Sequence, residues 1–432
     1  MIRWRHVVIR TTLRSSWRLE LATLSLLVAI ICLDWLVWGT ERAQAQSVTE
    51  SVLYSFCSQP GCTDGAAPLS GLAQGGDGNF YGATSEGGDN FDGTVFKLTP
   101  SGALTTLHSF CSQPGCSDGA TPLAALVEGS DGNLYGTTYQ GGNANSAGTV
   151  FRISPAGSFT TLYTFCSRAG CSDGVNPWAQ LTEGRDGNFY GTTELGGTNN
   201  WGTVFKITPS GTLTTLYSFC SRKDCGDGNL PLASLTEVRN GNFYSTTYGG
   251  GAHLNGTVFK IEPSGKLTTL HSFCRRKDCT DGALPWAGLS QGKNGDFYGT
   301  TWSGGPAYGT VFKVTPSGAS TTLYRFCNPV GALGCTDGAT PWAGLTEVGK
   351  GHFFGTTSVG GVTFGTVFEV TPSGKLTTIY SFCSQANNLA SCTDGEVPRS
   401  GLLKASDGNL YGTTEEGGAN TWGTVFRLAV SP

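Results

Sequence analysis

The chain has 432 residues, of which 65 are glycine, 13% are charged and one is methionine. This composition favours many short strands joined by tight turns and argues against a helical protein. The formal net charge is −4, which excludes a nucleic-acid-binding protein with a strongly basic surface. Solubility explains the mild acidity, so no partner is inferred from it.

Residues 1–45 are expected to form an export signal. Five arginines precede an apolar stretch, Leu21–Trp38, and the small-residue motif Ala43-Gln44-Ala45 follows it. This order is typical of a secretory signal peptide. An uncleaved membrane anchor is the alternative, because the stretch approaches spanning length, but Asp34 interrupts it. We expect cleavage after Ala45, which leaves residues 46–432 as an exported chain outside the membrane.

The cysteines beyond this signal form seven close pairs. These pairs are Cys57/Cys62, Cys111/Cys116, Cys166/Cys171, Cys220/Cys225, Cys274/Cys279, Cys327/Cys335 and Cys383/Cys392. An even number with none left over predicts local disulfides in an oxidising compartment. A zinc site would need four converging ligands, and no histidine recurs near the pairs. A redox motif would place two residues between the cysteines. We therefore expect disulfides, with no metal site and no cofactor.

The mature chain is a tandem repeat with a period close to 54 residues. The phrase Gly-Thr-Val-Phe begins at Gly93, Gly148, Gly202, Gly256, Gly309, Gly365 and Gly423. Self-similarity at a fixed period of this size is typical of solenoids and propellers. The architecture of one repeat therefore decides the fold.

Each repeat is expected to contain four strands. In residues 177–219 these strands are Pro177–Thr182, Asn188–Thr193, Gly202–Ile207 and Leu213–Phe219. Asp186-Gly187 is suited to a tight hairpin turn, and Thr208–Gly211 forms a second turn. Val204 and Phe205 point to opposite faces of the third strand, so both faces of the sheet must be covered.

The two ends of the mature chain distinguish a propeller from a β-solenoid. Ser51–Phe56 matches the fourth strand of a repeat, and the last repeat ends after its third strand, Gly423–Leu428. A solenoid would need terminal caps, which are not visible. The sequence therefore predicts an all-β, seven-bladed β-propeller of four-stranded antiparallel blades. Its N-terminal strand should complete the last blade.

The repeat resembles the GloVer tandem-repeat proteins, a family of secreted bacterial proteins. The resemblance rests on the unit DGNFYGTT…GG…GTVFKITPSG…TTLYSFC, whose best copies are Asp186–Phe219 and Asp131–Phe165. It covers residues 50–428 and implies an extracellular repeat protein without an assigned activity. Members carry a C-terminal anchoring segment, whereas none is visible before Pro432, so the resemblance does not imply surface attachment here.

One rim of the expected propeller carries every variable loop, and binding is expected there. Aromatic residues in the loops between the second and third strands are the candidate ligand contacts, because sugar rings stack on aromatic faces. These candidates are Trp201, Tyr308, Trp422, Phe364, Phe91, Tyr139 and Trp302. The alternative is that they cover the ends of the core between blades. Trp178, Trp286 and Trp342, which enter the first strand beside the channel, are expected to be packing residues.

An Asp-Gly pair follows the second cysteine of every pair. The aspartates are Asp64, Asp118, Asp173, Asp227, Asp281, Asp337 and Asp394. A ring of seven carboxylates could bind a cation at the channel mouth. Sevenfold identity favours a structural role instead, in which each aspartate accepts backbone N–H groups of its own turn before the first strand.

No catalytic set is visible in the sequence. His108 and His271 occupy a repeat position that elsewhere holds tyrosine, which indicates strand packing. The last position of the first strand requires only polarity, because it holds Glu128, Glu183, Glu237, Glu347, Gln74, Gln291 or Lys404. A glycosidase would need two carboxylates in unlike environments, and the sequence does not show which loops approach each other.

The leading hypothesis is an exported, monomeric, non-catalytic binding module. Its ligand would be a glycan or a cell-surface partner rather than a nucleic acid. The alternatives are a propeller enzyme acting on polysaccharide and a purely structural surface or matrix protein.

Overall fold

The computed structural model describes residues 48–304, 308–327, 334–349, 351–361, 364–383 and 392–430. The expected export signal over residues 1–45 lies outside the described part. Within the described part, no helix has the length and apolar character needed to cross a membrane.

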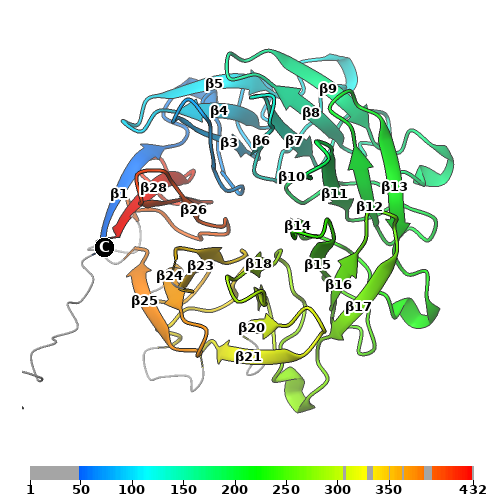
Figure 1. The fold of residues 1–432 in the computed structure, drawn as a ribbon. Coiled ribbons are helices and arrows are strands. Elements are labelled where there is room, and N and C mark those ends of the chain that lie inside the picture. The colour runs from blue at the N-terminus through cyan, green and yellow to red at the C-terminus, as the bar shows by residue number, and fades with distance from the viewer. Residues whose placement is uncertain are drawn as a thin grey trace, which may run out of the picture. The chain divides into compact units, whose positions relative to one another are not determined.

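The described residues form seven four-stranded antiparallel sheets arranged as blades around a central channel (Figure 1). The first strands, nearest the channel, are β2 (Ala73–Gln74), β6 (Val127–Glu128), β10 (Thr182–Glu183), β14 (Thr236–Glu237), β18 (Ser290–Gln291), β22 (Thr346–Glu347) and β26 (Leu403–Lys404). The second strands are β3 (Phe80–Thr84), β7 (Leu134–Thr138), β11 (Phe189–Thr193), β15 (Phe243–Thr247), β19 (Phe297–Thr301), β23 (Phe353–Thr357) and β27 (Leu410–Thr414).

The third and fourth strands lie progressively further from the channel. The third strands are β4 (Thr94–Leu98), β8 (Thr149–Ile153), β12 (Thr203–Ile207), β16 (Thr257–Ile261), β20 (Thr310–Val314), β24 (Thr366–Val370) and β28 (Thr424–Val430). The fourth strands are β5 (Leu104–Ser109), β9 (Phe159–Thr164), β13 (Leu213–Ser218), β17 (Leu267–Ser272), β21 (Ser320–Arg325), β25 (Leu376–Ser381) and β1 (Val48–Ser55). Blades 1 to 6 are β2–β5, β6–β9, β10–β13, β14–β17, β18–β21 and β22–β25, and blade 7 combines β26–β28 with β1.

The ring closes as the sequence predicts. The N-terminal strand β1 pairs antiparallel with β28, with Val48 opposite Val430 and Ser55 opposite Thr424. Blade 7 therefore takes strands from both ends of the described chain, which removes the exposed edges that an open array would leave. The predicted fold class, a seven-bladed propeller with four-stranded blades, is confirmed.

The predicted first strand is wrong in extent. Only Thr182 and Glu183 pair with β11, whereas a strand was expected from Pro177 onward. Pro177 has no N–H to donate to a ladder. The side chain of Gln180 donates across the channel wall to the carbonyl of Leu126 in blade 2, 2.9 Å away. The segment before β10 therefore lines the channel instead of extending the sheet.

Apolar side chains from both faces of each blade fill the spaces between blades. Val204 and Phe205 are both fully buried, and they belong to clusters on opposite sides of blade 3. Tyr190 of blade 3 and Phe243 of blade 4 place their ring centroids 4.2 Å apart. Burial of each large side chain contributes about 1.5–3 kcal/mol, so these layers account for much of the stability. The prediction that both faces are covered is confirmed.

Among the described residues, the polar residue that ends the first strand bonds to a neighbouring blade in five of the seven blades. The carboxylate of Glu183 accepts hydrogen bonds from the backbone N–H and hydroxyl of Ser130 in blade 2, at 3.1 and 2.7 Å. Gln74 accepts from the N–H of Ser406 across the ring closure, at 2.8 Å. Lys404 makes a contact of the opposite direction, donating to the carbonyl of Val348 in blade 6 at 3.4 Å, so the position requires a polar side chain without fixing the residue.

Candidate functional site

The disulfide loops lie on the rim that also carries the loops between second and third strands. In the described residues each of the seven predicted cysteine pairs is bonded, as expected. In five loops a short 3-10 turn contains the second cysteine. These turns are η1 (Pro60–Cys62), η2 (Pro114–Cys116), η3 (Ala169–Cys171), η4 (Lys223–Cys225) and η5 (Lys277–Cys279).

The last two disulfide loops differ from this pattern. Cys327 bonds Cys335 and Cys383 bonds Cys392 across eight and nine residues, whereas the other pairs are five residues apart. Among the described residues, neither Cys335 nor Cys392 lies in a 3-10 turn, although both pairs form the local disulfides that were expected.

One contact of the second cysteine persists in these longer loops. Cys392 is buried and Cys335 is partly exposed, yet the carbonyl of each accepts from the N–H of the second residue in the double glycine that follows the second strand, at 2.8 Å. The carbonyl of Cys171 accepts from Gly197 in the same way, at 3.0 Å. The anchoring of the second cysteine to its own blade is therefore shared by the shorter and the longer loops.

The recurring aspartate of each loop has a structural role. Asp173 is fully buried, and its Oδ2 accepts from the Tyr163 hydroxyl at 2.7 Å and from both the N–H and hydroxyl of Ser167. Tyr163 belongs to the fourth strand β9, and Ser167 lies between the two bonded cysteines. The expectation of donors in the turn before the first strand is therefore wrong, although the structural interpretation holds for this residue.

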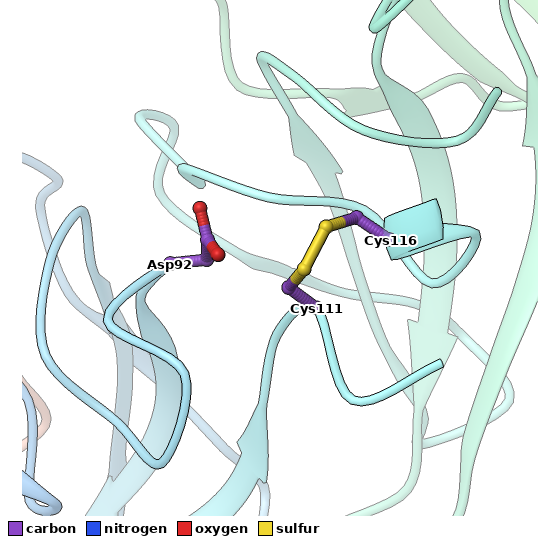
Figure 2. A group of neighbouring side chains, drawn as sticks. All are labelled: Asp92, Cys111 and Cys116. Atoms are coloured by element: carbon purple, nitrogen blue, oxygen red, sulfur yellow. A yellow bond between two sulfur atoms is a disulfide. The ribbon is translucent and has the colours of Figure 1, made fainter. Parts of the chain in front are cut away.

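One group of side chains in the described residues has atoms close enough to share a metal ion. It comprises Asp92, Cys111 and Cys116, and Figure 2 shows the Asp92 carboxylate beside the two sulfur atoms. Those sulfurs are bonded to each other, so they offer no thiolate ligand. Burial raises the pKa of Asp92, and the negative charge of Asp118 raises it further. The group therefore does not supply the ligand set of a metal centre.

The mouth of the central channel contains a cavity of about 510 Å³. In every blade, the residue that follows the proline before the first strand borders this cavity. These side chains are Leu69, Leu123, Trp178, Leu232, Trp286, Trp342 and Arg399 in blades 1 to 7. The repeats agree closely in their strands but differ at this position, so the cavity is asymmetric around the ring.

Six aromatic side chains form what we call the aromatic crescent along blades 2 to 6. Its members are Tyr139, Trp178, Tyr248, Trp286, Trp302 and Trp342, all of them partly exposed. Trp286 lies at its centre, with ring centroids 5.7 Å from Trp178, 4.3 Å from Trp342 and 5.0 Å from Tyr248. The predicted packing of the three channel tryptophans is found, but they pack on one another in the cavity wall rather than in the core between blades.

The blade 7 side of the mouth is charged. The guanidinium carbon of Arg399 lies 4.8 Å from the centroid of the Trp342 ring, and Arg399 pairs with Glu415 at 3.0 Å. Burial raises the pKa of Glu415, Arg399 opposes this change, and Glu416 adds to it. Burial and the charge of Glu416 also raise the pKa of Glu396. The cavity is thus bordered by three tryptophans and by Arg399, whose guanidinium is paired with Glu415.

The sequence-predicted aromatic residues divide into two groups. Tyr139 and Trp302 belong to the crescent, where the Tyr139 hydroxyl donates to Glu194 at 2.9 Å. Burial, together with this hydrogen bond, raises the pKa of Tyr139 to about 12. The other five residues lie in the loops of separate blades, and these are Phe91, Trp201, Tyr308, Phe364 and Trp422.

This second group does not form a single site. Trp201 and Trp422 are 41% and 43% exposed, and Phe91 is 68% exposed. Tyr308 is partly buried and packs against a core cluster between blades 5 and 6. The Trp201 carbonyl accepts from the N–H of Leu230, which places this loop at the seam between blades 3 and 4. Trp201, Tyr308 and Trp422 therefore lie at three different seams of the ring.

Neither the Trp286-centred crescent nor Arg399 was predicted from the sequence as a candidate site. A signal was present, because the residue after the proline varies from Leu to Trp to Arg while its neighbours repeat. What the sequence did not show was that all seven copies of this position meet around one cavity.

The fold and the rim define a class: a disulfide-bridged, seven-bladed propeller of tandem repeats with an asymmetric channel mouth. The model of the Gloeobacter/Verrucomicrobia repeat matches residues 42–239 and 223–392. The chain belongs to this family, which confirms the resemblance seen in the sequence.

A solved structure shares this fold at low sequence identity. The extracellular domain of a protein assigned as a hybrid two-component system from B. thetaiotaomicron aligns over 88% of this chain, with 13% identity and a TM-score of 0.54. The chain spans 41% of the length of that structure. A protein assigned as a 6-phosphogluconolactonase from Bacteroides uniformis aligns over 75% of this chain and 84% of its own, with 17% identity and a TM-score of 0.47. The sequence matches no curated protein.

Proposed function

We propose that this protein is an exported, monomeric, non-catalytic binding module that holds a glycan at its channel mouth. The observation that carries the proposal is the aromatic crescent beside a cavity of about 510 Å³. Sugar rings present an apolar face and polar edges, so they stack on partly exposed Trp and Tyr side chains. A concave, largely apolar site with a few polar groups is the usual form of a small-ligand site.

The two kinds of side chain at the cavity suit the two kinds of sugar surface. Trp286 and Trp342 offer ring faces, and the Arg399–Glu415 pair offers donors and acceptors for hydroxyl groups. A nucleic acid is disfavoured, because acidic residues outnumber basic ones in the chain.

Export is the part of the proposal that rests on the cysteines and the N-terminus. Disulfides persist in oxidising compartments, and the chain carries one in each repeat. Residues 1–45 have the order of a secretory signal, with cleavage expected after Ala45.

The seam aromatics extend the proposed site. Trp201 and Trp422 are exposed on the same rim as the cavity, and Tyr308 lies at a third seam. We propose that they contact the outer sugars of a longer glycan, whereas a short glycan reaches only the crescent.

A polysaccharide-cleaving enzyme is the second candidate function. The observation in its favour is that Glu415, whose pKa is raised by burial, pairs at 3.0 Å with Arg399, a residue that borders the cavity. A carboxyl group with a raised pKa beside a cavity can act as a general acid. If the partner were instead a cell-surface protein, binding would depend on the exposed residues of the rim and not on the cavity.

A glycan-array screen of residues 46–432, followed by assay of every bound glycan for cleavage, tests the proposal. The crescent variant is Trp178→Leu, Trp286→Leu, Trp342→Leu, which introduces the residue found in blades 1, 2 and 4. The matched rim variant is Trp201→Ala, Tyr308→Ala, Trp422→Ala. We expect the crescent variant to lose all glycans and the folded rim variant to lose only the longer ones.

Three results would contradict parts of this proposal. Binding that survives in the folded crescent variant would remove the cavity from the site. Cleavage of a bound glycan that disappears in a Glu415→Gln variant would favour the enzyme. An unfolded rim variant would assign the seam aromatics to the core.

A further inference from the structure

The side-chain contacts at the outer edge of blade 4 differ from those at the same place in blade 3. In blade 3, the Tyr217 hydroxyl and the Ser221 hydroxyl both donate to Asp227, at 2.7 and 2.9 Å. In blade 4, the equivalent positions hold His271 and Arg275. The Nε2 of His271 lies 3.9 Å from Asp281, beyond hydrogen-bond distance, whereas the imidazole of His108 at the same position of blade 1 reaches Asp118 at 3.1 Å.

Two hollows lie around this imidazole. One, of about 320 Å³, is lined by His271, Arg275, Arg276, Asp281 and the segment that begins β21. The other, of about 380 Å³, is lined by His253, His271 and Arg275 together with part of β17. His271 and Arg275 border both hollows, so the two hollows share one polar boundary.

The polar groups at these hollows lack protein partners. The His271 side chain is only 5% exposed, and neither ring nitrogen has a hydrogen-bond partner among the described residues. A buried N–H without an acceptor is rare in proteins and points to a missing ligand or solvent molecule. The nearest carboxylate, Asp281, accepts from the backbone N–H groups of Arg275 and Arg276 but lies too far from the ring to bond it.

The two guanidinium groups are also available. Within the described part of the chain, the side chains of Arg275 and Arg276 are exposed and form no hydrogen bond or ion pair. The residue equivalent to Arg276 in blade 3 behaves differently. Arg222 donates through Nη2 to the carbonyl of Leu267 in the next blade, at 3.3 Å. The guanidinium groups of blade 4 are therefore free to bind a ligand, whereas the Arg222 guanidinium of blade 3 is held by the next blade.

We propose that this outer edge of blade 4 binds a tetrahedral oxyanion, a sulfate or phosphate group, held by Arg275 and Arg276 from outside and by His271 from beneath. Guanidinium groups match the oxygen geometry of such anions and do not lose their charge. The site is separate from the aromatic crescent, because it lies beside the outermost strand of blade 4 and shares no residue with the channel cavity.

The charges facing His271 give the site a pH signature. Burial lowers its pKa, Asp281 opposes this, and Arg275, Arg276 and His253 lower it further. Blade 5 contributes Gly318, Ala319, Ser320 and Thr322 to the hollow, none of which titrates near neutral pH. A bound anion favours the imidazolium form, so anion affinity should rise as pH falls from 8 to 5.5.

Isothermal titration of residues 46–432 at constant ionic strength tests this proposal. The probes are inorganic sulfate, inorganic phosphate, glucose 6-sulfate and glucose 6-phosphate, with chloride as background. We expect one site per chain for at least one probe, with affinity increasing toward pH 5.5. Tighter binding of the sugar esters than of the free ions would identify an ester group on a glycan as the ligand, and the reverse order would identify a free ion.

Two matched variants make the test specific. His271→Tyr with Arg275→Ser recreates the blade 3 sequence, which this fold already accommodates, and should weaken binding at least about tenfold. Tyr217→His with Ser221→Arg transfers the blade 4 pattern to blade 3 and should add a second site. The proposal is overturned if no probe binds more tightly than chloride, or if the first variant binds as the parent protein does.

Discussion

Asp227 shows how one repeated residue holds a disulfide loop in place. Burial by itself would raise its pKa, but hydrogen bonds from Tyr217, Ser221 and Arg222 more than offset this effect, and the net pKa is lowered. The carboxylate is fully buried and accepts four hydrogen bonds. Its charge is therefore stabilised by the loop that it organises.

Removing this carboxylate should destabilise the protein in a pH-dependent way. Asp227→Ala leaves the Tyr217 hydroxyl and two backbone N–H groups without an acceptor, at a cost of about 1–3 kcal/mol at pH 7. Because the folded pKa lies below the unfolded value, this stabilisation exists above the unfolded pKa and is lost as pH falls through the folded pKa. Urea unfolding at pH 7 and pH 3 measures the difference between parent and variant.

The control for this substitution is Asp89→Ala, at an exposed position of blade 1, which should change the free energy of unfolding by no more than about 0.5 kcal/mol. If Asp227→Ala lowers the free energy of unfolding equally at pH 3 and pH 7, the negative charge of the carboxylate contributes nothing to stability.

Single residues could be interpreted from the sequence where their partners are local. Asp173 and its disulfide loop lie within ten residues, so the structural role was predictable, although the donors were not. Trp286 is different, because its neighbours Trp178 and Trp342 come from repeats more than fifty residues away. These side chains come together only in the folded ring. The distances between them cannot be read from their positions in the sequence.

At the scale of the element, the closing strand β1 carries an unusual carboxyl group. Burial and the negative charge of Asp394 raise the pKa of Glu50 to about 7, and a hydrogen bond with Tyr380 opposes the shift only in part. Glu50 lies opposite Leu428 in the pairing of β1 with β28. Ionisation of Glu50 therefore works against the strand that closes the ring.

The stability of the protein should consequently fall as pH rises through this range. The folded pKa of about 7 lies above the ordinary 4.5, so the unfolded chain binds fewer protons between these values and unfolding is favoured as pH increases. Glu50→Gln stays neutral, and should match the parent protein near pH 4.5 and exceed its stability at pH 8. Urea unfolding at both pH values provides the measurement.

Glu86→Gln, at an exposed position, is the matched control and should follow the parent protein at both pH values. If Glu50→Gln is no more stable than the parent protein at pH 8, the closing strand is insensitive to this carboxyl group.

The disulfide loops stabilise the molecule individually by a modest amount. Cys166 and Cys171 are five residues apart, and closing so short a loop restrains the unfolded chain by about 2 kcal/mol. Cys166→Ser with Cys171→Ser should lower the free energy of unfolding by about that amount and leave the propeller folded. Denaturant unfolding of the oxidised protein measures this cost, and a loss of the whole fold would contradict a local role.

Element boundaries followed the sequence wherever hydrogen bonds stay within a blade. The second, third and fourth strands of blade 3 differ from the predicted ranges by one residue at an end. The first strand differs more, because Gln180 and Thr182 donate to carbonyls of the neighbouring blades. Contacts between repeats have no periodic signature within a repeat, so they were missed.

At the scale of the whole molecule, the residues that recur in every repeat and the residues that vary lie in different parts of the propeller. Gly-Thr-Val-Phe recurs because Val and Phe of each third strand fill the two sides of a blade. The position after the proline is free of this constraint, since its side chain faces the channel cavity instead of a neighbouring sheet. The number of blades and the closing strand were predictable, whereas the asymmetric mouth required the closed ring.

The central claim is that the aromatic crescent binds a glycan, and one titration tests it most directly. The shortest glycan identified on the array is titrated calorimetrically into the parent protein and into Trp286→Leu, with Trp201→Ala as the control. Loss of one stacked ring should raise the Kd about tenfold, because such contacts contribute roughly 1 kcal/mol beyond the buried area. Trp201→Ala should leave the Kd for this short glycan unchanged. A folded Trp286→Leu protein with the parent Kd would contradict the account.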